Sequence, residues 1–501
     1  MKGVVAAGHP QTAEAGAAVL REGGNAVDAA VAAVLASFAT ESPLTGFGAG
    51  GFMMVHGGAA TTLIDFFVSA PGADGIERKA ELAPIPVHFD PETVQTFYVG
   101  PASCGVPGTA AGLERALARF GSMPMAELAR EGARLAREGA LVNEEQAFIL
   151  EILNPIHARL EGTRELYAPG GNLLTEGDLI RFPELAEALE RFGSEGSEPF
   201  YRGEIAEEIV ETVIAGGGIL GSGDLAAYEA IERQPIRAPF RDTEVLTNPP
   251  PSSGGILIAF CLGLLERMGE ESGSEQIVAA MGAADSARGE DFAEALYGEG
   301  LEASMLDPGG LDAAAGDLLG STTHISVLDG AGMCASVTCS NGSGSGVLVP
   351  GTGVILNNML GEEDLNPLGF HRIEPGRRVP SMMAPTVVLR DGEIELGLGS
   401  AGSNRIRSAI LQTIVRAVEQ GMAAEEAVSA PRLHFEAGLV QAEPGIDEEA
   451  LARLEAGGLP VARRPQINLF FGGVQAVARD HRTGALSGGG DPRRGGAVAI
   501  A

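Results

Sequence analysis

Small apolar residues recur at helical spacing through the first part of the chain. The segments TAEAGAAVLREGG (12–24) and NAVDAAVAAVLASFATESP (25–43) carry this pattern and stop at glycine or proline, so each predicts a helix. Residues 108–230 are mostly amphipathic, and the pattern predicts helices whose acidic faces are turned to solvent. A further apolar helix is expected over 256–267, behind the stiff turn NPPPSSGG at 248–255.

Short apolar runs around turn residues predict three β-hairpins. The paired runs are 52–58 with 61–67, 323–329 with 333–340, and the two halves of 384–399 around Asp391-Gly392. Residues 299–321 are rich in Gly, Ala and Asp without a sustained period, which predicts an exposed loop. A helix over 404–420 and several short strands complete the chain. Helices and strands in separate runs indicate an α+β fold built in layers.

The composition indicates a globular protein that is not expected to bind polyanions. Of the 501 residues, 45% are hydrophobic and 20% charged, enough for roughly two to four domains or for one large one. Lys and Arg total 34 against 67 Asp and Glu, and the net charge of −33 repels phosphate backbones and anionic membrane surfaces. The longest apolar run, GGILIAFCLGLL, is shorter than a membrane span, and the first residues lack a signal-peptide pattern. We therefore expect a soluble, cytoplasmic protein with no nucleic-acid or membrane partner.

Metal and nucleotide motifs are weak in this sequence. The four cysteines form no C-x-x-C pair and the eight histidines show no ligand spacing, so we expect buried free thiols and no bound metal. The run GFGAGG at 46–51 matches the dinucleotide pattern, but the strand FMMVHG follows where that fingerprint requires a helix. No cofactor is implied.

The run GSTTHISVLD (320–329) combines a strand with possible nucleophiles. Threonines commonly open surface strands, so the pattern alone is also compatible with a purely structural role. A threonine hydroxyl becomes a strong nucleophile when a base takes its proton, and the threonine's own α-amine, with a pKa of about 7.7–8.0, can be that base. Thr322 has a free α-amine only if the bond from Ser321 to Thr322 is cut.

Motifs along nearly the whole chain give a stronger indication. They are GGNAVDAAVA (23–32), GFGAGGFMM (46–54), GVPGTAAGL (105–113), FYRG (200–203), PPPSSGG (249–255), TTHISV (322–327), GVILNN (353–358) and SMMAPTVV (381–388). Together they resemble the γ-glutamyltransferase family of N-terminal-nucleophile (Ntn) hydrolases. The resemblance implies a four-layer αββα fold and a precursor that cuts itself before Thr322. The products would be a large region, 1–321, and a small region, 322–501, that together form one αββα unit.

The resemblance also implies roles for the residues that follow Thr322, the expected nucleophile. Ser340 falls where the family places a hydroxyl that hydrogen-bonds the nucleophile, and Asn341 falls at a substrate-contact position. Glu362 stands at about the acidic position that holds the donor's α-ammonium, and Glu363 is an equally good candidate.

Two further segments complete the expected site. Ser381 matches a serine that contacts the donor's α-carboxylate, while Met382 replaces a second serine. Gly402 and Ser403 occupy the turn whose backbone N–H groups form the oxyanion hole, with Ser403 in place of a second glycine. Phe67, in DFFV, stands where the family has the arginine that clamps the α-carboxylate, and phenylalanine cannot make that bidentate contact.

Other arginines could replace the missing clamp. The candidates by position are Arg372, Arg377, Arg378 and Arg405. Without one of them, an apolar ring at position 67 favours a donor whose group there is uncharged or bulkier.

The expected activity is therefore transfer or hydrolysis of γ-glutamyl amides such as glutathione, by a large and small subunit pair formed by self-cleavage. Water or an amine would accept the acyl group. The sequence leaves open whether two such subunit pairs form a dimer. One alternative is an acylase acting on other acyl amides, such as glutaryl amides. A second alternative is a non-catalytic relative kept for binding, against which the presence of Thr322, His324, Ser340 and the Gly402 turn counts.

Overall fold

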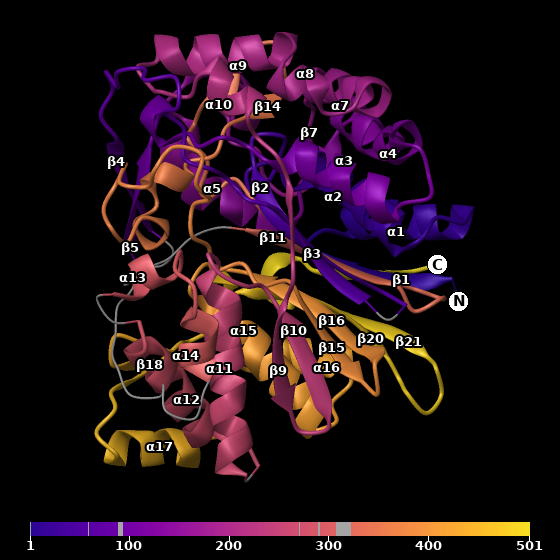
Figure 1. The fold of residues 1–501 in the computed structure, drawn as a ribbon, viewed down its shortest axis with the longest axis vertical. Coiled ribbons are helices and arrows are strands. Elements are labelled where there is room, and N and C mark those ends of the chain that lie inside the picture. The colour runs from indigo at the N-terminus through magenta and orange to yellow at the C-terminus, as the bar shows by residue number, and fades with distance from the viewer. Residues whose placement is uncertain (1, 59, 89–93, 270, 289–290, 307–321) are drawn as a thin grey trace.

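Two β-sheets stacked face to face form the centre of the computed structural model, and helices cover the outer face of each sheet (Figure 1). The structure describes residues 2–58, 60–88, 94–269, 271–288, 291–306 and 322–501. One sheet has seven strands and the other six. Neighbouring strands in both sheets are antiparallel. The order helices, sheet, sheet, helices confirms the predicted αββα architecture.

The seven-stranded sheet interleaves the N-terminal and C-terminal parts of the chain. Its strands, in spatial order, are β22 (Ala497–Ile500), β1 (Gly3–Ala7), β11 (Thr323–Asp329), β12 (Cys334–Ser340), β2 (Gly50–Gly57), β3 (Ala60–Phe66) and β8 (Ile231–Arg233). The hairpins β2–β3 and β11–β12 lie side by side, as Cys339 pairs with Gly51. A cut before Thr322 would leave two chains that share this sheet.

The six-stranded sheet contains the third predicted hairpin. In spatial order its strands are β21 (Leu486–Gly490), β20 (Gly473–Arg479), β16 (Glu393–Ala401), β15 (Thr386–Arg390), β10 (Thr243–Thr247) and β9 (Ile236–Phe240). Asp391 and Gly392 turn the β15–β16 hairpin with φ of 52° and 80°. Positive φ at both central residues suits a two-residue hairpin, which explains the Asp-Gly pair.

Helices pack on the outer face of each sheet. Those on the side of the seven-stranded sheet include α1 (Pro10–Glu22), α2 (Ala26–Thr40), α3 (Thr109–Phe120), α4 (Met125–Glu138), α5 (Glu144–His157), α6 (Glu161–Tyr167), α7 (Pro183–Glu195), α8 (Glu198–Tyr201), α9 (Glu204–Ala215) and α10 (Ser222–Ala226). Those on the other side include α11 (Ser253–Met268), α12 (Ser274–Ser286), α15 (Arg405–Ile414), α16 (Ala424–Ser429) and α17 (Glu448–Ala456). Smaller sheets pair β4 (Ala83–His88) with β5 (Val94–Val99), and β17 (Leu433–Glu436) with β18 (Leu439–Ala442) and β19 (Val461–Arg463).

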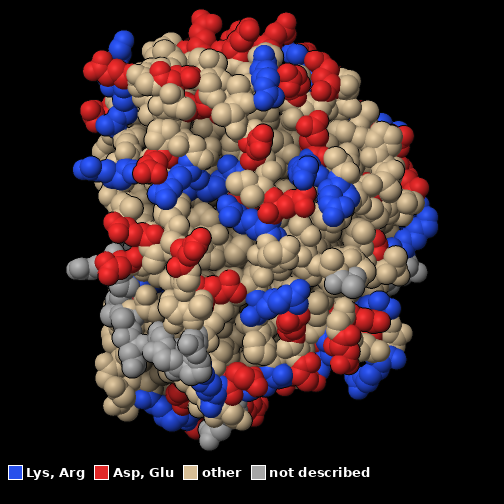
Figure 2. All heavy atoms as spheres, viewed as in Figure 1, with Lys and Arg blue, Asp and Glu red and all other residues tan. Residues whose placement is uncertain are grey.

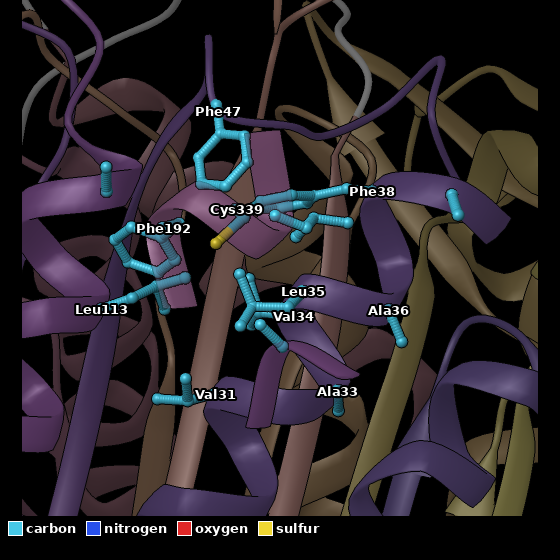
Figure 3. Packing of buried hydrophobic residues seen from close by; sticks show 14 of the residues in the cluster. Val31, Ala33, Val34, Leu35, Ala36, Phe38, Phe47, Leu113, Phe192 and Cys339 are labelled. Carbon is cyan, nitrogen blue, oxygen red and sulfur yellow. The ribbon is translucent and has the colours of Figure 1, made fainter. Parts of the chain in front are cut away.

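Helix α2 lies at the centre of the first helical layer. All its residues are buried, because small alanines and valines let it pack closely against both the sheet and α4. Figure 3 shows Val31 and Phe38 of this helix in one cluster with Phe47, with Phe192 of α7 and with Cys339 of β12. The Asn25 side chain accepts from the N–H groups of residues 27 and 28, which fixes the start of the helix.

The predicted loop over 299–321 is partly wrong. Residues Leu301–Leu306 form a helix, α14, and Met305 is buried against the core beneath the six-stranded sheet. Six residues are too few for a helical period to be visible in the sequence. This short helix is stabilised by packing against α11. Residues 307–321, which include Ser321, lie outside the described residues.

The surface carries interspersed charges of both signs. Figure 2 shows acidic side chains along the end of the molecule where Figure 1 places α9, whose exposed residues include Glu204, Glu207, Glu208 and Glu211. All four cysteines are buried and free. Within the part of the chain that the structure describes, no helix has both the length and the apolar character that crossing a membrane requires.

Candidate active site

Thr322 and Ser340 lie opposite each other at one end of the β11–β12 hairpin. The register pairs Thr323 with Cys339, so the residues one step further along each strand also face each other. The Thr322 Oγ1 hydroxyl points at Ser340 Oγ over 3.5 Å, the outer limit of a hydrogen bond. Ser340 Oγ in turn accepts from the Gly342 N–H at 2.8 Å. Thr322 is 5% exposed, so its hydroxyl is held in a largely water-free position.

Both hydroxyls line one pocket, whose space, including the part that is open to solvent, is about 290 Å³. It is lined by Phe67, Thr322, Ser340, Met359, Glu362, Asp364, Leu365, Ser381, Met382, Met383, Ser403 and Ile406. These residues come from the end of β3, the β11–β12 hairpin, the segment 359–365, the segment before β15, and the turn that leads from β16 into α15. The two sheets therefore meet at the pocket, and each supplies part of its wall.

The turn after β16 has an unusual backbone. Gly402 has φ of 119°, and a Cβ there would lie 2.7 Å from the Gly472 Cα, so only glycine fits. Ser403 also has a positive φ, 52°, which is uncommon for a residue with a side chain. Its Oγ donates to Asp364 Oδ2 at 2.6 Å, and this bond supports the conformation. Asn404 next to it donates through Nδ2 to Glu436 Oε1 at 2.7 Å. The turn is therefore anchored from two sides.

Two carboxyl groups, those of Glu362 and Asp364, form an acidic wall of the pocket. Glu362 Oε1 accepts from the Ser343 N–H at 2.9 Å, whereas the buried Oδ1 of Asp364 has no partner among the described residues. Burial, followed by the neighbouring Asp364, raises the pKa of Glu362 well above its usual range. Burial also raises the pKa of Asp364, against the hydrogen bond from Ser403 and the nearby Arg288 and Arg405. The pocket therefore holds two acids whose charged forms are disfavoured by burial.

Much of the remaining pocket wall is apolar. Phe67 is 1% exposed, and its ring stacks on Phe52 with 5.4 Å between the centroids. The Phe67 carbonyl accepts from the Tyr228 hydroxyl at 2.8 Å, which holds the backbone just after β3. Met382 receives a hydrogen bond from Ser253 Oγ to its sulfur at 3.2 Å. The pocket wall therefore includes an aromatic ring and thioethers as well as the two acids.

Arginines do not line this pocket. Arg378 pairs with Asp65 at 3.1 Å, and Arg233 approaches the same carboxylate at 2.7 Å. Arg377 pairs with Glu374 at 3.5 Å, and Arg405 donates through Nε to the Phe470 carbonyl at 3.0 Å. Arg372 is exposed. The residues that the structure leaves undescribed include no lysine or arginine. Of the four candidates for the clamp, none contributes to the pocket wall.

The described residues that line the pocket include no histidine either. His324 lies on β11, two residues after Thr322, but its ring interacts with Thr338 Oγ1 at 2.7 Å and Ser326 Oγ at 2.9 Å. Burial lowers the pKa of His324 to about 3, so the ring is neutral. Its place is in the contact between the two sheets, where a Cβ on Gly399 would lie 2.3 Å from it. We conclude that His324 is held as a structural residue.

The structure brings most of the predicted site residues together. Phe67, Thr322, Ser340, Glu362, Ser381, Met382 and Ser403 line the pocket, and Gly402 adjoins Ser403. Asn341 does not line it: its side-chain amide is buried and has no hydrogen-bond partner among the described residues. Glu363 is exposed and interacts with Tyr98. Asp364, which sequence reasoning missed, takes a place in the wall because the backbone turns Glu362 and Asp364 inward and Glu363 outward.

Comparisons with known proteins point to one family. The chain matches the gamma-glutamyltranspeptidase family model over residues 12–501. It is 31% identical over 544 residues to the glutathione hydrolase proenzyme of Bacillus subtilis (strain 168), covering 99% of this chain and 91% of that protein. It is 32% identical over 511 residues to the acylase ACY 1 proenzyme of Pseudomonas sp. (strain SE83), covering 95% and 90%. The crystal structure of cephalosporin acylase from Bacillus halodurans matches with a TM-score of 0.84 and 24% identity, covering 100% and 96%.

The family match, together with the stacked sheets and their two helical layers, makes the chain an Ntn hydrolase. Within that class, the chain belongs to the γ-glutamyltranspeptidase family. Relatives named for glutathione hydrolysis and for acylase activity are about equally similar, so family membership leaves the acyl donor undecided.

Proposed function

We propose that this chain is the precursor of an amide-cleaving acyl hydrolase or transferase whose nucleophile is Thr322. The observation that carries the proposal is the position of the Thr322 hydroxyl, which faces Ser340 in a pocket bordered by the Gly402 turn. Cleavage before Thr322 would give a large subunit, 1–321, and a small subunit, 322–501. The interleaved strands of the seven-stranded sheet would hold the two together.

Self-cleavage and catalysis use the same hydroxyl. In the precursor, Thr322 Oγ1 attacks the Ser321 carbonyl carbon, the bond to the Thr322 nitrogen breaks, and that nitrogen takes a proton. Water then hydrolyses the ester, which leaves a carboxylate on Ser321 and a free amine on Thr322. This amine is the proposed general base, because the pocket wall contains neither histidine nor lysine.

In each turnover the amine takes the proton of Thr322 Oγ1 as the oxygen attacks the substrate's amide carbon. The N–H groups of Gly402 and Ser403 stabilise the tetrahedral oxyanion. The Thr322 amine then passes this proton to the leaving amine of the substrate, and an acyl ester on Thr322 remains. Water or a second amine then attacks the ester and releases the acid or the new amide.

The pocket favours donors with an ammonium group and without a carboxylate. Asp364 Oδ1 is an acceptor without a partner among the described residues, beside a second acid, so it suits an ammonium. A donor carboxylate would meet two acids and Phe67, and would gain no ion pair. We therefore propose that glutathione-like donors, which carry both groups, are accepted weakly, with donors such as 4-aminobutyryl amides preferred.

The second candidate is an acylase for uncharged acyl groups. The apolar wall formed by Phe67, Met359 and Met382 favours it, and acylases are among the similar proteins. A glutaryl donor fits less well than the sequence alone suggests, because its carboxylate would also lack a cation. A non-catalytic role is disfavoured by the nucleophile, the glycine turn and the pocket lying together.

Four matched anilides test the donor class on the processed protein: γ-glutamyl, 4-aminobutyryl, glutaryl and butyryl. They carry both charged groups, only the ammonium, only the carboxylate, or neither. We expect the highest kcat/KM for 4-aminobutyryl anilide, and expect Asp364→Asn to reduce this preference over butyryl anilide. A preference for glutaryl anilide would contradict the proposed donor class. Turnover of an anilide by Thr322→Ala would contradict the proposed nucleophile.

A further inference from the structure

A buried carboxylate lies behind the nucleophile, on the side of the sheet away from the pocket. Glu41 directly follows α2 and is 2% exposed. Its Oε2 accepts from Thr323 Oγ1 at 2.5 Å, and its Oε1 accepts from Thr12 Oγ1 at 3.2 Å. Thr12 Oγ1 also bonds Thr40 Oγ1 at 2.7 Å. Glu41 therefore ties the first residue of β11 to helices α1 and α2.

The space around this carboxylate is closed. A Cβ on Gly8 would lie 2.4 Å from Glu41 Oε2 and 3.3 Å from Thr323 Oγ1, so the chain passes over the hydrogen bond without room for another atom. Glycine at position 8 permits this approach. A hydroxyl that lost Glu41 would thus have little chance of replacing it with water.

Glu41 is also electrostatically linked to the turn on the other sheet. The buried Arg494 lies close enough to lower the pKa of Glu41. Arg494 Nη2 is 3.8 Å from the position that a Cβ of Gly402 would take, and its aliphatic part packs against Gly473. Arg494 therefore links the surroundings of Glu41 to the Gly402 turn.

Self-cleavage would make these contacts more important. Thr323 is the first residue of β11 with a strand partner, and Thr322 lies one step outside the ladder. In the processed enzyme Thr322 would be a chain end, and chain ends are poorly ordered unless they are tied down. The Thr323 hydroxyl bond to Glu41 is a tie one residue from the reacting atoms.

We propose that Glu41 is a positioning residue: by holding Thr323, it fixes the Thr322 hydroxyl and amine relative to Ser340 and the Gly402 turn. The proposal rests on the proposed role of Thr322 as nucleophile. Glu41 itself lies outside the pocket and touches no substrate.

Removing the Thr323 hydroxyl tests this role. Thr323→Val keeps the side-chain shape, and Thr323→Ser restores the hydroxyl. Misplacing a reacting group by about 1 Å can cost about 100-fold in rate, so we expect Thr323→Val to lower kcat by about 10- to 100-fold with little change in KM. Thr323→Ser should recover most of kcat, and Thr323→Val should add little further loss to Glu41→Gln.

Thr12→Val is the matched control. It removes the other threonine hydroxyl bonded to Glu41, from an equally buried site on α1. A purely structural network would make the two valine variants alike in melting temperature and in kcat. We expect similar melting temperatures but a loss of kcat in Thr323→Val alone. If Thr323→Val fails to self-cleave while Thr12→Val cleaves normally, the same positioning role is supported.

Two results would overturn the proposal. One is an active wild type with unchanged kcat in Thr323→Val, and the other is an equal loss of kcat in Thr12→Val. Both leave the proposed function intact. A wild-type protein that is unprocessed and inactive would instead remove the proposed function, and this proposal with it.

Discussion

Phe67→Arg should change the donor preference of the enzyme more than any other single substitution at the pocket. The variant would add a guanidinium to the pocket that Glu362 and Asp364 also line. Phe67 is buried and stacked on Phe52, so the change costs apolar packing and buries a charge.

The expected magnitude follows from the contact that is gained. A charge-assisted bidentate bond to a carboxylate in a partly desolvated pocket is worth about 2–4 kcal/mol, or roughly 30- to 1000-fold in kcat/KM. This gain applies to γ-glutamyl anilide and not to 4-aminobutyryl anilide, which differs only in lacking the carboxylate. Because both donors carry the ammonium, the ratio of their kcat/KM values isolates the carboxylate.

The assay measures that ratio in wild type, Phe67→Arg and Phe67→Leu. We expect it to favour 4-aminobutyryl anilide in wild type and to shift toward γ-glutamyl anilide by roughly 30-fold or more in Phe67→Arg. Phe67→Leu removes the ring without adding charge and should leave the ratio nearly unchanged. A wild type that already prefers γ-glutamyl anilide, with no improvement in Phe67→Arg, would refute the reasoning and show that the carboxylate is held elsewhere.

Two further predictions concern titration. The rate should rise with pH at an apparent pKa below about 7.7, because burial of the Thr322 amine disfavours its ammonium form; a pH–kcat profile that is flat between about pH 6 and 9 while chemistry limits the rate would contradict this. Burial raises the pKa of Glu41 from 4.5 to about 7, against the hydrogen bonds from Thr323 and Thr12 and the charge of Arg494. The unfolded chain therefore loses this proton first as pH rises, and Glu41 should destabilise the fold progressively between about pH 4.5 and 7. The melting temperature of Glu41→Gln, relative to wild type, should increase over that interval, and a constant difference would count against the raised pKa.

Local patterns were sufficient to predict the main elements of the fold. The Asp391-Gly392 turn and the alternating runs on either side predict a hairpin that the structure contains. Helix α14 was missed because six residues carry no readable period and depend on packing against α11. Which strands become neighbours depends on contacts distant in the chain, such as β1 beside β11, and these left no local signal.

The candidate site was predictable in outline from motifs and less so in detail. Glu362 and Glu363 could not be separated by sequence, because their orientation depends on one short turn that exposes Glu363 and buries its neighbour. The same turn brings in Asp364, for which the run of three consecutive acids was the available signal. Glu41 gave no signal of its own, since its contact with Thr323 spans 282 positions.

Intact mass measurement of the purified protein tests the central claim most directly. If Thr322 is an N-terminal nucleophile, wild type should resolve into two fragments, 1–321 and 322–501, and sequencing of the smaller should begin at Thr322. Thr322→Ala should remain one chain of 501 residues. A wild-type protein that stays a single chain of that length while turning over an amide substrate would contradict the account.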